Sequence, residues 1–215
     1  MDNSLISPYA QALSTRKAQL ESYLDQGFQA IAIPAHTGQF APAGMHFLGK
    51  SGVTFFVIGV IALVAGLIVG SMGLIIAGAA AIVSGCYLWA KGKQATRTEA
   101  FALLGKKIFA EISVIADKIA ADWHSFVAVQ NDNLKKQIVS SSASVDSKVA
   151  LIDKVEKSTE VNVDLDAMQA DIQAVDAREN LDGYTAYLAR AEQQIKTAIE
   201  NADGAQKSIY TTINV

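Results

Sequence analysis

Charge, proline and cysteine are scarce in much of this 215-residue sequence. Between Gln26 and Ala90 the only charged residue is Lys50. A single cysteine, Cys86, excludes an intramolecular disulfide and a thiol pair that could bind a metal. All three prolines (Pro8, Pro34 and Pro42) lie in the first fifth of the chain, so little later in the sequence interrupts a helix. These absences predict an all-α protein with one long uncharged segment.

Motifs for catalysis and metal binding are missing as well. His36, His46 and His124 are far apart, and none has a carboxylate or cysteine partner at the helical spacing of a zinc motif. The sequence contains no phosphate loop, nucleophile elbow or dinucleotide fingerprint. We therefore expect no enzyme activity, cofactor, metal or small-molecule substrate. His36 and His46 precede the uncharged segment, where they are either a pH trigger for insertion or two partly exposed loop residues.

The uncharged segment has the length of two membrane spans. Val53–Gly70 and Gly73–Ala90 each hold about 18 residues, roughly 27 Å of helix against a hydrocarbon core of roughly 30 Å. Because the link is so short, we expect antiparallel arms whose outer ends lie on one side of the bilayer. The side chains predicted to enter the membrane are Val53, Phe55, Phe56, Ile58, Ile61, Leu63, Leu67, Ile68, Leu74, Ile75, Ile76, Ile82, Val83 and Leu88.

Glycine recurs along both arms at seven-residue intervals, which is two helical turns. Such stripes of small residues let helix backbones approach closely. The predicted packing positions are Gly59, Gly66, Gly70, Gly73, Gly78 and Gly85. Two interpretations stay open, because the stripes serve either the contact between the two arms or the association of separate subunits.

Aromatic and basic residues flank the outer end of both arms, and the turn carries no charge. This distribution is typical of a membrane interface, where the basic side chains meet anionic head groups. It also predicts cytoplasmic termini if a translocon inserts the chain. The predicted interfacial residues are Lys50, Tyr87, Trp89, Lys91, Lys93 and Arg97.

Amphipathic helices are predicted on both sides of the hairpin. Ser7-Pro8 starts one that ends before Pro34, followed by an uncharged loop over residues 34–49. After the hairpin, an eleven-residue pattern predicts one straight helix from Thr98 to about Asn131, with a bend or break at Ser140 to Ser144. Its apolar face, the natural cover for the hairpin in water, consists of Phe101, Leu104, Ile108, Ile112, Ile115, Ile119, Trp123 and Phe126.

Two heptad patterns fill the C-terminal part, over 161–175 and 184–209. The change of phase at Arg178 to Gly183 favours a turn between two antiparallel helices over a stutter in one. From Leu151 onward the sequence contains twelve acidic and six basic residues, and this negative charge argues against a nucleic-acid partner. We expect three regions: an N-terminal helix and loop over 1–50, the hairpin over 51–92, and a helical bundle or coiled coil over 93–215.

The hairpin, with its Gly70 to Gly73 tip, and the helices after Thr98 resemble the α-helical pore-forming toxins of the cytolysin A and haemolysin BL type. Short two-span membrane effectors of bacteria are similar too. The resemblance implies a toxin or effector that oligomerises, alone or with related helical subunits, and permeabilises a lipid bilayer. The alternative is a constitutive two-span anchor that presents a coiled-coil scaffold to a protein partner.

Two locations fit these expectations. The first residues, from Met1 to Ala10, lack a basic cluster, and the apolar run starts too late for a cleavable signal. The chain is therefore expected at a membrane. It is either secreted without a leader and inserted into a target membrane, or held in an inner membrane with cytoplasmic termini.

Overall fold

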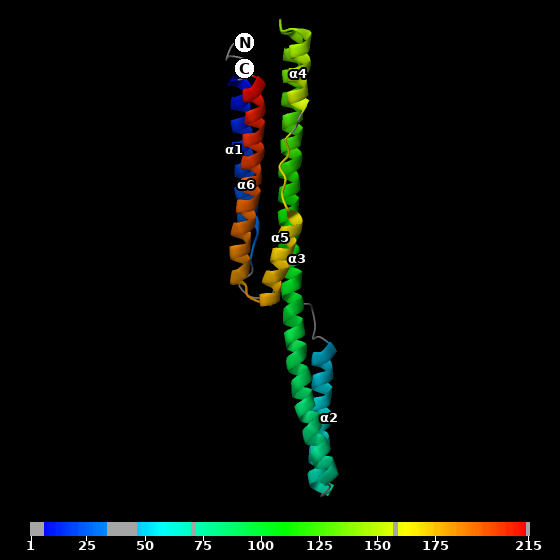
Figure 1. Cartoon of the computed structure of the whole chain (residues 1–215). Coiled ribbons are helices and arrows are strands. Elements are labelled where there is room, and N and C mark those ends of the chain that lie inside the picture. The colour runs from blue at the N-terminus through cyan, green and yellow to red at the C-terminus, as the bar shows by residue number, and fades with distance from the viewer. Residues whose placement is uncertain (1–6, 34–46, 70–71, 157–158, 214–215) are drawn as a thin grey trace. The chain divides into compact units, whose positions relative to one another are not determined.

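A computed structural model describes residues 7–33, 47–69, 72–156 and 159–213 of the chain. These residues form six helices and no strand, which confirms the all-α prediction (Figure 1). The helices are α1 (Ser7–Ala30), α2 (Phe47–Val69), α3 (Met72–Ser140), α4 (Val145–Glu156), α5 (Leu165–Arg178) and α6 (Asp182–Ile213). The side chains of residues 7, 47, 48, 63–75 and 212 lie outside the description.

The chain divides into two compact units. The bundle unit contains Met1–Ala32, Ile108–Asp171 and Tyr184–Val215. The hairpin unit contains Ile33–Lys107 and Ile172–Gly183. Helix α3 contributes residues to both, so the change of unit falls inside a helix.

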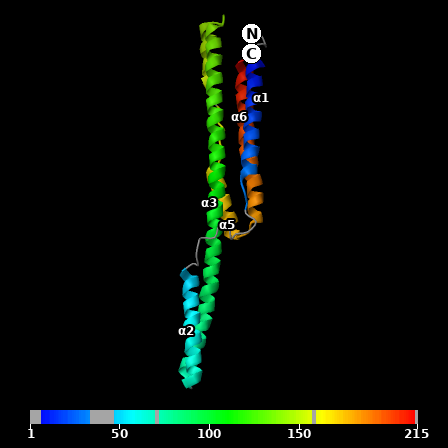
Figure 2. The same ribbon diagram turned by 180° about the vertical axis from the view of Figure 1, so that it is seen from behind.

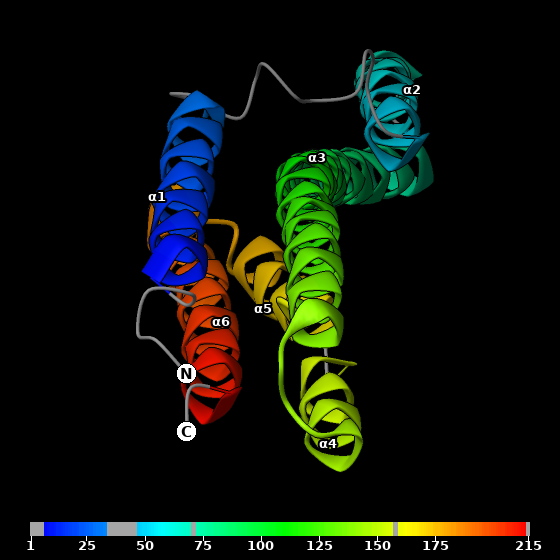
Figure 3. The same cartoon turned by 90° about the horizontal axis from the view of Figure 1, so that it is seen from above.

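Antiparallel packing of α1 and α6 is a main feature of the bundle unit, and Figures 1 and 3 show the two helices side by side. The rings of Tyr9, near the start of α1, and Tyr210, near the end of α6, have centroids 5.9 Å apart. The predicted apolar spacing of α1 is confirmed, because Leu13, Leu20 and Leu24 are all buried. Helix α1 ends at Ala30, as expected for a chain that approaches Pro34.

Helix α3 is longer than predicted. The second hairpin arm and the amphipathic helix from Thr98 were expected as separate segments, yet they form one helix of 69 residues. No proline interrupts residues 90–98, and the hydroxyl of Thr96 donates to the carbonyl of Gly92 within the helix. The helix ends at Ser140, so the predicted break at the serine cluster is confirmed.

The predicted apolar face of α3 is buried from Phe101 to Trp123, and only Phe126 at its end is partly exposed. In the bundle unit this face is occupied by other elements. The side chain of Ile115 packs against Gly27 of α1, and Nε1 of Trp123 donates to the carbonyl of Thr159 at 3.0 Å. The expectation that the whole face covers the hairpin in water is therefore wrong in this structure.

The start of α2 also differs from the prediction. The loop was expected to extend to Gly49 and the arm to begin at Val53, but α2 begins at Phe47. No proline lies between Phe47 and Gly52, so the helix extends back from the arm. The rest of the predicted loop, residues 34–46 with His36 and His46, lies outside the described residues.

The phase change between α5 and α6 is a turn, as favoured from the sequence. Glu179 has a φ of 51°, a left-handed conformation that ends α5. The backbone amide of Gly183 donates to the carbonyl of Asn180, and α6 begins at Asp182. Asp164 is the N-cap of α5, because its Oδ1 accepts a hydrogen bond from the backbone amide of Ala167 at 2.9 Å.

The buried face of α6 corrects the predicted heptad. Ala205 is exposed and Ile209 only half-buried, whereas Gln206 and Tyr210 are buried. Buried positions repeat every eleven residues from Tyr184 through Ile195 to Gln206. That period belongs to a straighter helix than a heptad coil requires, and the sequence pattern missed it because one member of the series is polar.

A buried polar network joins α6 to the rest of the bundle unit. The Nε2 of Gln206 donates to Oδ1 of Asn131 at 3.1 Å, and its Oε1 accepts the hydroxyl of Thr159 at 2.8 Å. Nδ2 of Asn131 in turn donates to the carbonyl of Val155 at 3.0 Å. Because each amide is satisfied by partners on other segments, the network fixes the register of α6 against α3.

Candidate functional site

The two hairpin arms, α2 and the first part of α3, pack against each other through glycine (Figure 2). A Cβ placed on Gly59 would lie 2.7 Å from the backbone nitrogen of Ile82 and 2.8 Å from the carbonyl oxygen of Gly78. A Cβ on Gly85 would lie 2.6 Å from the nitrogen of Phe56. Because these neighbours are backbone atoms, only glycine fits. The described part of each stripe is therefore used inside the chain.

Sequence reasoning missed one member of this contact. Gly52 is buried, and a Cβ there would lie 2.7 Å from the carbonyl oxygen of Gly85. The signal was present, since Gly52 precedes Gly59 by the same seven residues that separate Gly59 from Gly66. Gly78 is buried as predicted, whereas Gly66, Gly70 and Gly73 lie outside the described side chains.

The apolar side chains of the arms point away from this contact. Ile61 is 63% exposed, Ile76 65% and Val83 69%. Val53, Phe55, Phe56 and Ile58 are exposed too, whereas Ile82 and Leu88 are partly buried. Five further predicted membrane residues lie outside the described side chains: Leu63, Leu67, Ile68, Leu74 and Ile75. The hairpin unit thus presents an apolar surface that its own residues leave uncovered.

Cations and aromatic rings meet at the outer end of the hairpin. Nζ of Lys93 lies 3.8 Å from the ring centroid of Trp89, and Nζ of Lys91 lies 5.8 Å from that of Tyr87. Lys50 is exposed at the start of α2. Such stacking holds an ammonium group beside an apolar surface while its hydrogens stay available to other acceptors.

Arg97, predicted at the interface with these lysines, is engaged elsewhere. Its Nε pairs with Oε2 of Glu179 at 3.2 Å, and its guanidinium donates to the carbonyl of Glu179 at 2.9 Å. The hydroxyl of Thr98 donates to the same carboxylate. These bonds attach the turn after α5 to α3, so Arg97 has a structural role in the hairpin unit.

Polar side chains contribute little to the described arm surface. The hydroxyl of Thr54 donates to the carbonyl of Lys50 one turn earlier, at 3.1 Å, and is thereby satisfied within α2. Ser84 is exposed on α3.

Over the described part of the chain, no helix combines the length and apolar character needed to cross a membrane.

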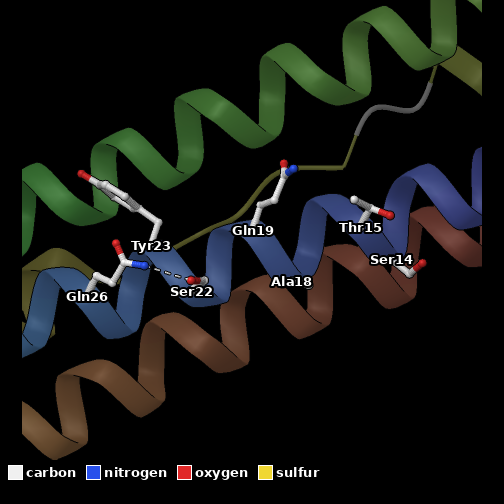
Figure 4. Close-up of a pocket in the computed structure, with 7 residues that line it drawn as sticks. All are labelled: Ser14, Thr15, Ala18, Gln19, Ser22, Tyr23 and Gln26. Atoms are coloured by element: carbon white, nitrogen blue, oxygen red, sulfur yellow. Dashed lines mark hydrogen bonds between the residues drawn. The ribbon is translucent and has the colours of Figure 1, made fainter.

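A shallow concave surface lies on α1, and Figure 4 shows its side chains along one face of the helix. None of them is acidic, basic, an imidazole or a thiol. The hydroxyls of Ser14 and Thr15 both donate to the carbonyl of Gln11, and the amide of Gln26 donates to Ser22. The seven residues are Ser14, Thr15, Ala18, Gln19, Ser22, Tyr23 and Gln26. This surface lacks the paired acid and base that general acid–base catalysis requires.

Charged residues of the described segments show no metal-binding arrangement, since none of them form a group of three or more potential ligands. His124 is exposed on α3. Asp164 and Asp166 are exposed at the start of α5. Asp164 acts there as a helix cap, which accounts for its position.

Comparison with known proteins adds no relative. No family model, curated protein or solved structure matches this chain. The function must therefore be inferred from the hairpin unit itself.

Proposed function

We propose that this chain inserts its hairpin into a lipid bilayer and, after assembly of several copies, permeabilises that membrane as a toxin or effector. The single observation that carries the proposal is the uncovered apolar surface of the described arms, whose backbones are already packed together through Gly52, Gly59 and Gly85. The proposal includes no catalytic step.

The free energy of hydration supports an apolar environment for this surface. Burial of one large aliphatic side chain contributes roughly 1.5–3 kcal/mol, and the arms expose several of them in a row. Monomeric soluble proteins rarely expose contiguous apolar patches of this kind. Since Lys50 is the only charge between Gln26 and Ala90, insertion of the hairpin would not bring an ion into the hydrocarbon.

Assembly of copies must use surfaces other than the described glycines. Gly59 and Gly85 face backbone of the opposite arm, which leaves no space for a second hairpin there. The exposed aliphatic side chains of the arms, together with the helices from Thr98 onward, are the surfaces available to a homo-oligomer or to related helical subunits.

A second function, that of a two-span anchor for a protein partner, is favoured by the state of Thr54. A water-filled lumen needs polar side chains along one face of each arm. Thr54 bonds to its own helix, and Ser84 is the other polar side chain on the described arm surface. An anchor would bind the membrane through the same apolar surface without forming a conducting path.

Vesicle flotation with matched lysine variants tests the insertion step. Val83→Lys places a charge on a hairpin residue that is 69% exposed, and Val129→Lys makes the same change at a bundle-unit residue that is 56% exposed. A lysine at the centre of a bilayer costs about 2.5–3.5 kcal/mol, or roughly 100-fold in partitioning. We expect Val83→Lys to lose flotation by that factor and Val129→Lys to float as the wild type does.

Release of an entrapped dye separates the two functions. Leakage that follows bound protein, with a threshold concentration that marks assembly, supports the permeabilising function. Full flotation without leakage supports the anchor. If the wild type fails to float at any lipid composition, both functions are excluded.

A further inference from the structure

An apolar groove lies between α2 and α3 at the outer end of the hairpin. Gly52 and Gly85 form its floor, where the backbones of the two helices are in contact. The rings of Phe56 and Trp89 flank it, and both are somewhat over 40% exposed, at 42% and 43%. The groove is lined by Gly52, Val53, Phe56, Gly85, Cys86 and Trp89, and its volume is about 310 Å³.

We propose that this groove holds one acyl chain of an anionic phospholipid, whose phosphate is bound by Lys93 at its rim. The inference rests on the proposed function, because it requires the hairpin to meet a bilayer. It adds a defined site and a lipid class to that function.

The size and lining of the groove suit an alkyl chain. Its volume lies at the lower end of the range for small-molecule sites, roughly 300–1,000 Å³, so it takes one chain and not a whole lipid or a packed helix. All six lining residues present carbon or sulfur to the hollow, and none carries a charge. An alkyl chain loses contact with water there without leaving a polar group unpaired.

The charge at the rim selects the head group. Lys93 stacks on Trp89, a wall of the groove, and Lys91 and Lys50 are exposed close by in sequence. Among the described residues, none of these three lysines forms an ion pair with a carboxylate. Phosphate groups of anionic lipids are attracted to such clusters next to an apolar surface.

The same charge argues against a second copy as the occupant. Another hairpin would bring its own Lys93 to this rim, and like charges at close range repel. An anionic lipid neutralises the rim, whereas a copy of the chain does not.

Fluorescence of Trp89 provides the test, since bromine on a lipid chain quenches a tryptophan that it touches. The only other tryptophan, Trp123, is 0% exposed and serves as an internal unquenched reference. The full chain is added to vesicles that contain phosphatidylcholine and phosphatidylglycerol in equal amounts. In one preparation only the phosphatidylglycerol is brominated, and in the other only the phosphatidylcholine.

We expect quenching by brominated phosphatidylglycerol to exceed that by brominated phosphatidylcholine about twofold or more. Cys86→Phe fills the groove and should bring the ratio to one, whereas Val83→Phe, on the same arm but outside the groove, should leave it unchanged. Lys93→Gln should lower the ratio while the chain still floats. These three results together support the site.

Two outcomes would overturn the inference, and they are distinguishable. A wild-type chain that floats with these vesicles but gives equal quenching by both lipids excludes the selective site and leaves membrane insertion intact. A chain that floats with no vesicle excludes the proposed function and this site with it.

Discussion

The two units of this protein use apolar residues in opposite ways. In the bundle unit Leu13, Ile112 and Ile195 have no measurable exposure, and the side chains fill the space between helices. In the hairpin unit Ile61 and Val83 are 63% and 69% exposed, because glycines occupy the space between the arms. One unit is built around side chains and the other around backbone contact.

This difference shows what each unit requires from its surroundings. A core of buried side chains is stabilised by water outside it. Close backbone packing with aliphatic side chains directed outward is the arrangement of helices in an apolar solvent, where the hydrophobic effect does not draw side chains inward. This arrangement supports the proposal that the hairpin unit meets an apolar environment, which the bundle unit does not need.

The largest expected effect comes from one substitution made in both units. Ile112→Ala removes a side chain that is fully buried, and we expect a loss of about 2–5 kcal/mol in the free energy of unfolding. Ile61→Ala, at a residue 63% exposed, should change it by less than about 0.5 kcal/mol. Chemical denaturation followed by circular dichroism measures both. Equal losses would show that the hairpin is buried and would remove the contrast between the units.

The next largest effect on the free energy of unfolding is expected from the buried polar network of the bundle unit. The described residues of the hairpin arms contain no such network. Gln206→Leu leaves the buried amide of Asn131 and hydroxyl of Thr159 each without one partner, so we expect a loss of about 1–3 kcal/mol in the free energy of unfolding. The double variant Asn131→Leu/Gln206→Leu should cost less than the sum of the single variants. Additive losses would mean that the two side chains do not interact.

Most of the bundle unit's helices could be predicted from apolar spacing alone. The face of α3 from Ile108 to Trp123 is buried as expected, since one side of the helix repeats aliphatic residues at helical intervals. The face of α6 was less accessible to this reasoning. Gln206 belongs to it only because Asn131 and Thr159, far away in sequence, supply its hydrogen bonds. Local pattern cannot reveal a partner of that kind.

The hairpin site was predictable in part. Seven-residue glycine spacing indicated the close contact, but it left open whether the partner was the other arm or another subunit. The structure assigns the described glycines to the other arm, and Gly52 enters the set. The groove beside Gly52 could not be predicted, because it depends on how far Phe56 and Trp89 stand apart across two helices.

A pH effect is expected at the end of the bundle unit where Tyr9 meets Tyr210. Burial raises the pKa of Tyr210 above its ordinary value of 10.0, and Tyr9 reinforces this effect. Burial raises the pKa of Tyr9 as well. Because the folded state favours the protonated phenols, their contribution to stability is complete below about pH 10 and is lost as the pH rises through the folded-state values.

Tyr210→Phe tests this effect. The hydroxyl of Tyr210 is buried without a hydrogen-bond partner among the described residues, so its removal should leave the free energy of unfolding unchanged or raise it by about 1 kcal/mol at neutral pH. Between about pH 9 and 11 the variant should lose less stability than the wild type, and Tyr9→Phe/Tyr210→Phe less again. Denaturant titrations at each pH measure it. Parallel profiles for all three proteins would exclude this pair as the source of the alkaline loss.

The smallest effect on stability is expected from a glycine-to-alanine change. Its direction should differ between the bundle unit and the hairpin unit. Gly204 lies inside α6 with open space around it, so Gly204→Ala should stabilise the chain by about 0.5–1 kcal/mol through the lower backbone entropy of the unfolded state. The same change at Gly59 places a methyl group 2.7 Å from the backbone nitrogen of Ile82, which forces the arms apart.

Thermal unfolding in water measures the stability of Gly204→Ala. Cross-linking of Cys86 to a cysteine introduced at Val53 measures the separation of the arms in Gly59→Ala. A gain in stability at Gly204 with retained cross-linking in Gly59→Ala would show that the arms tolerate a side chain between them, and the proposed distinction between side-chain and backbone packing would then fail.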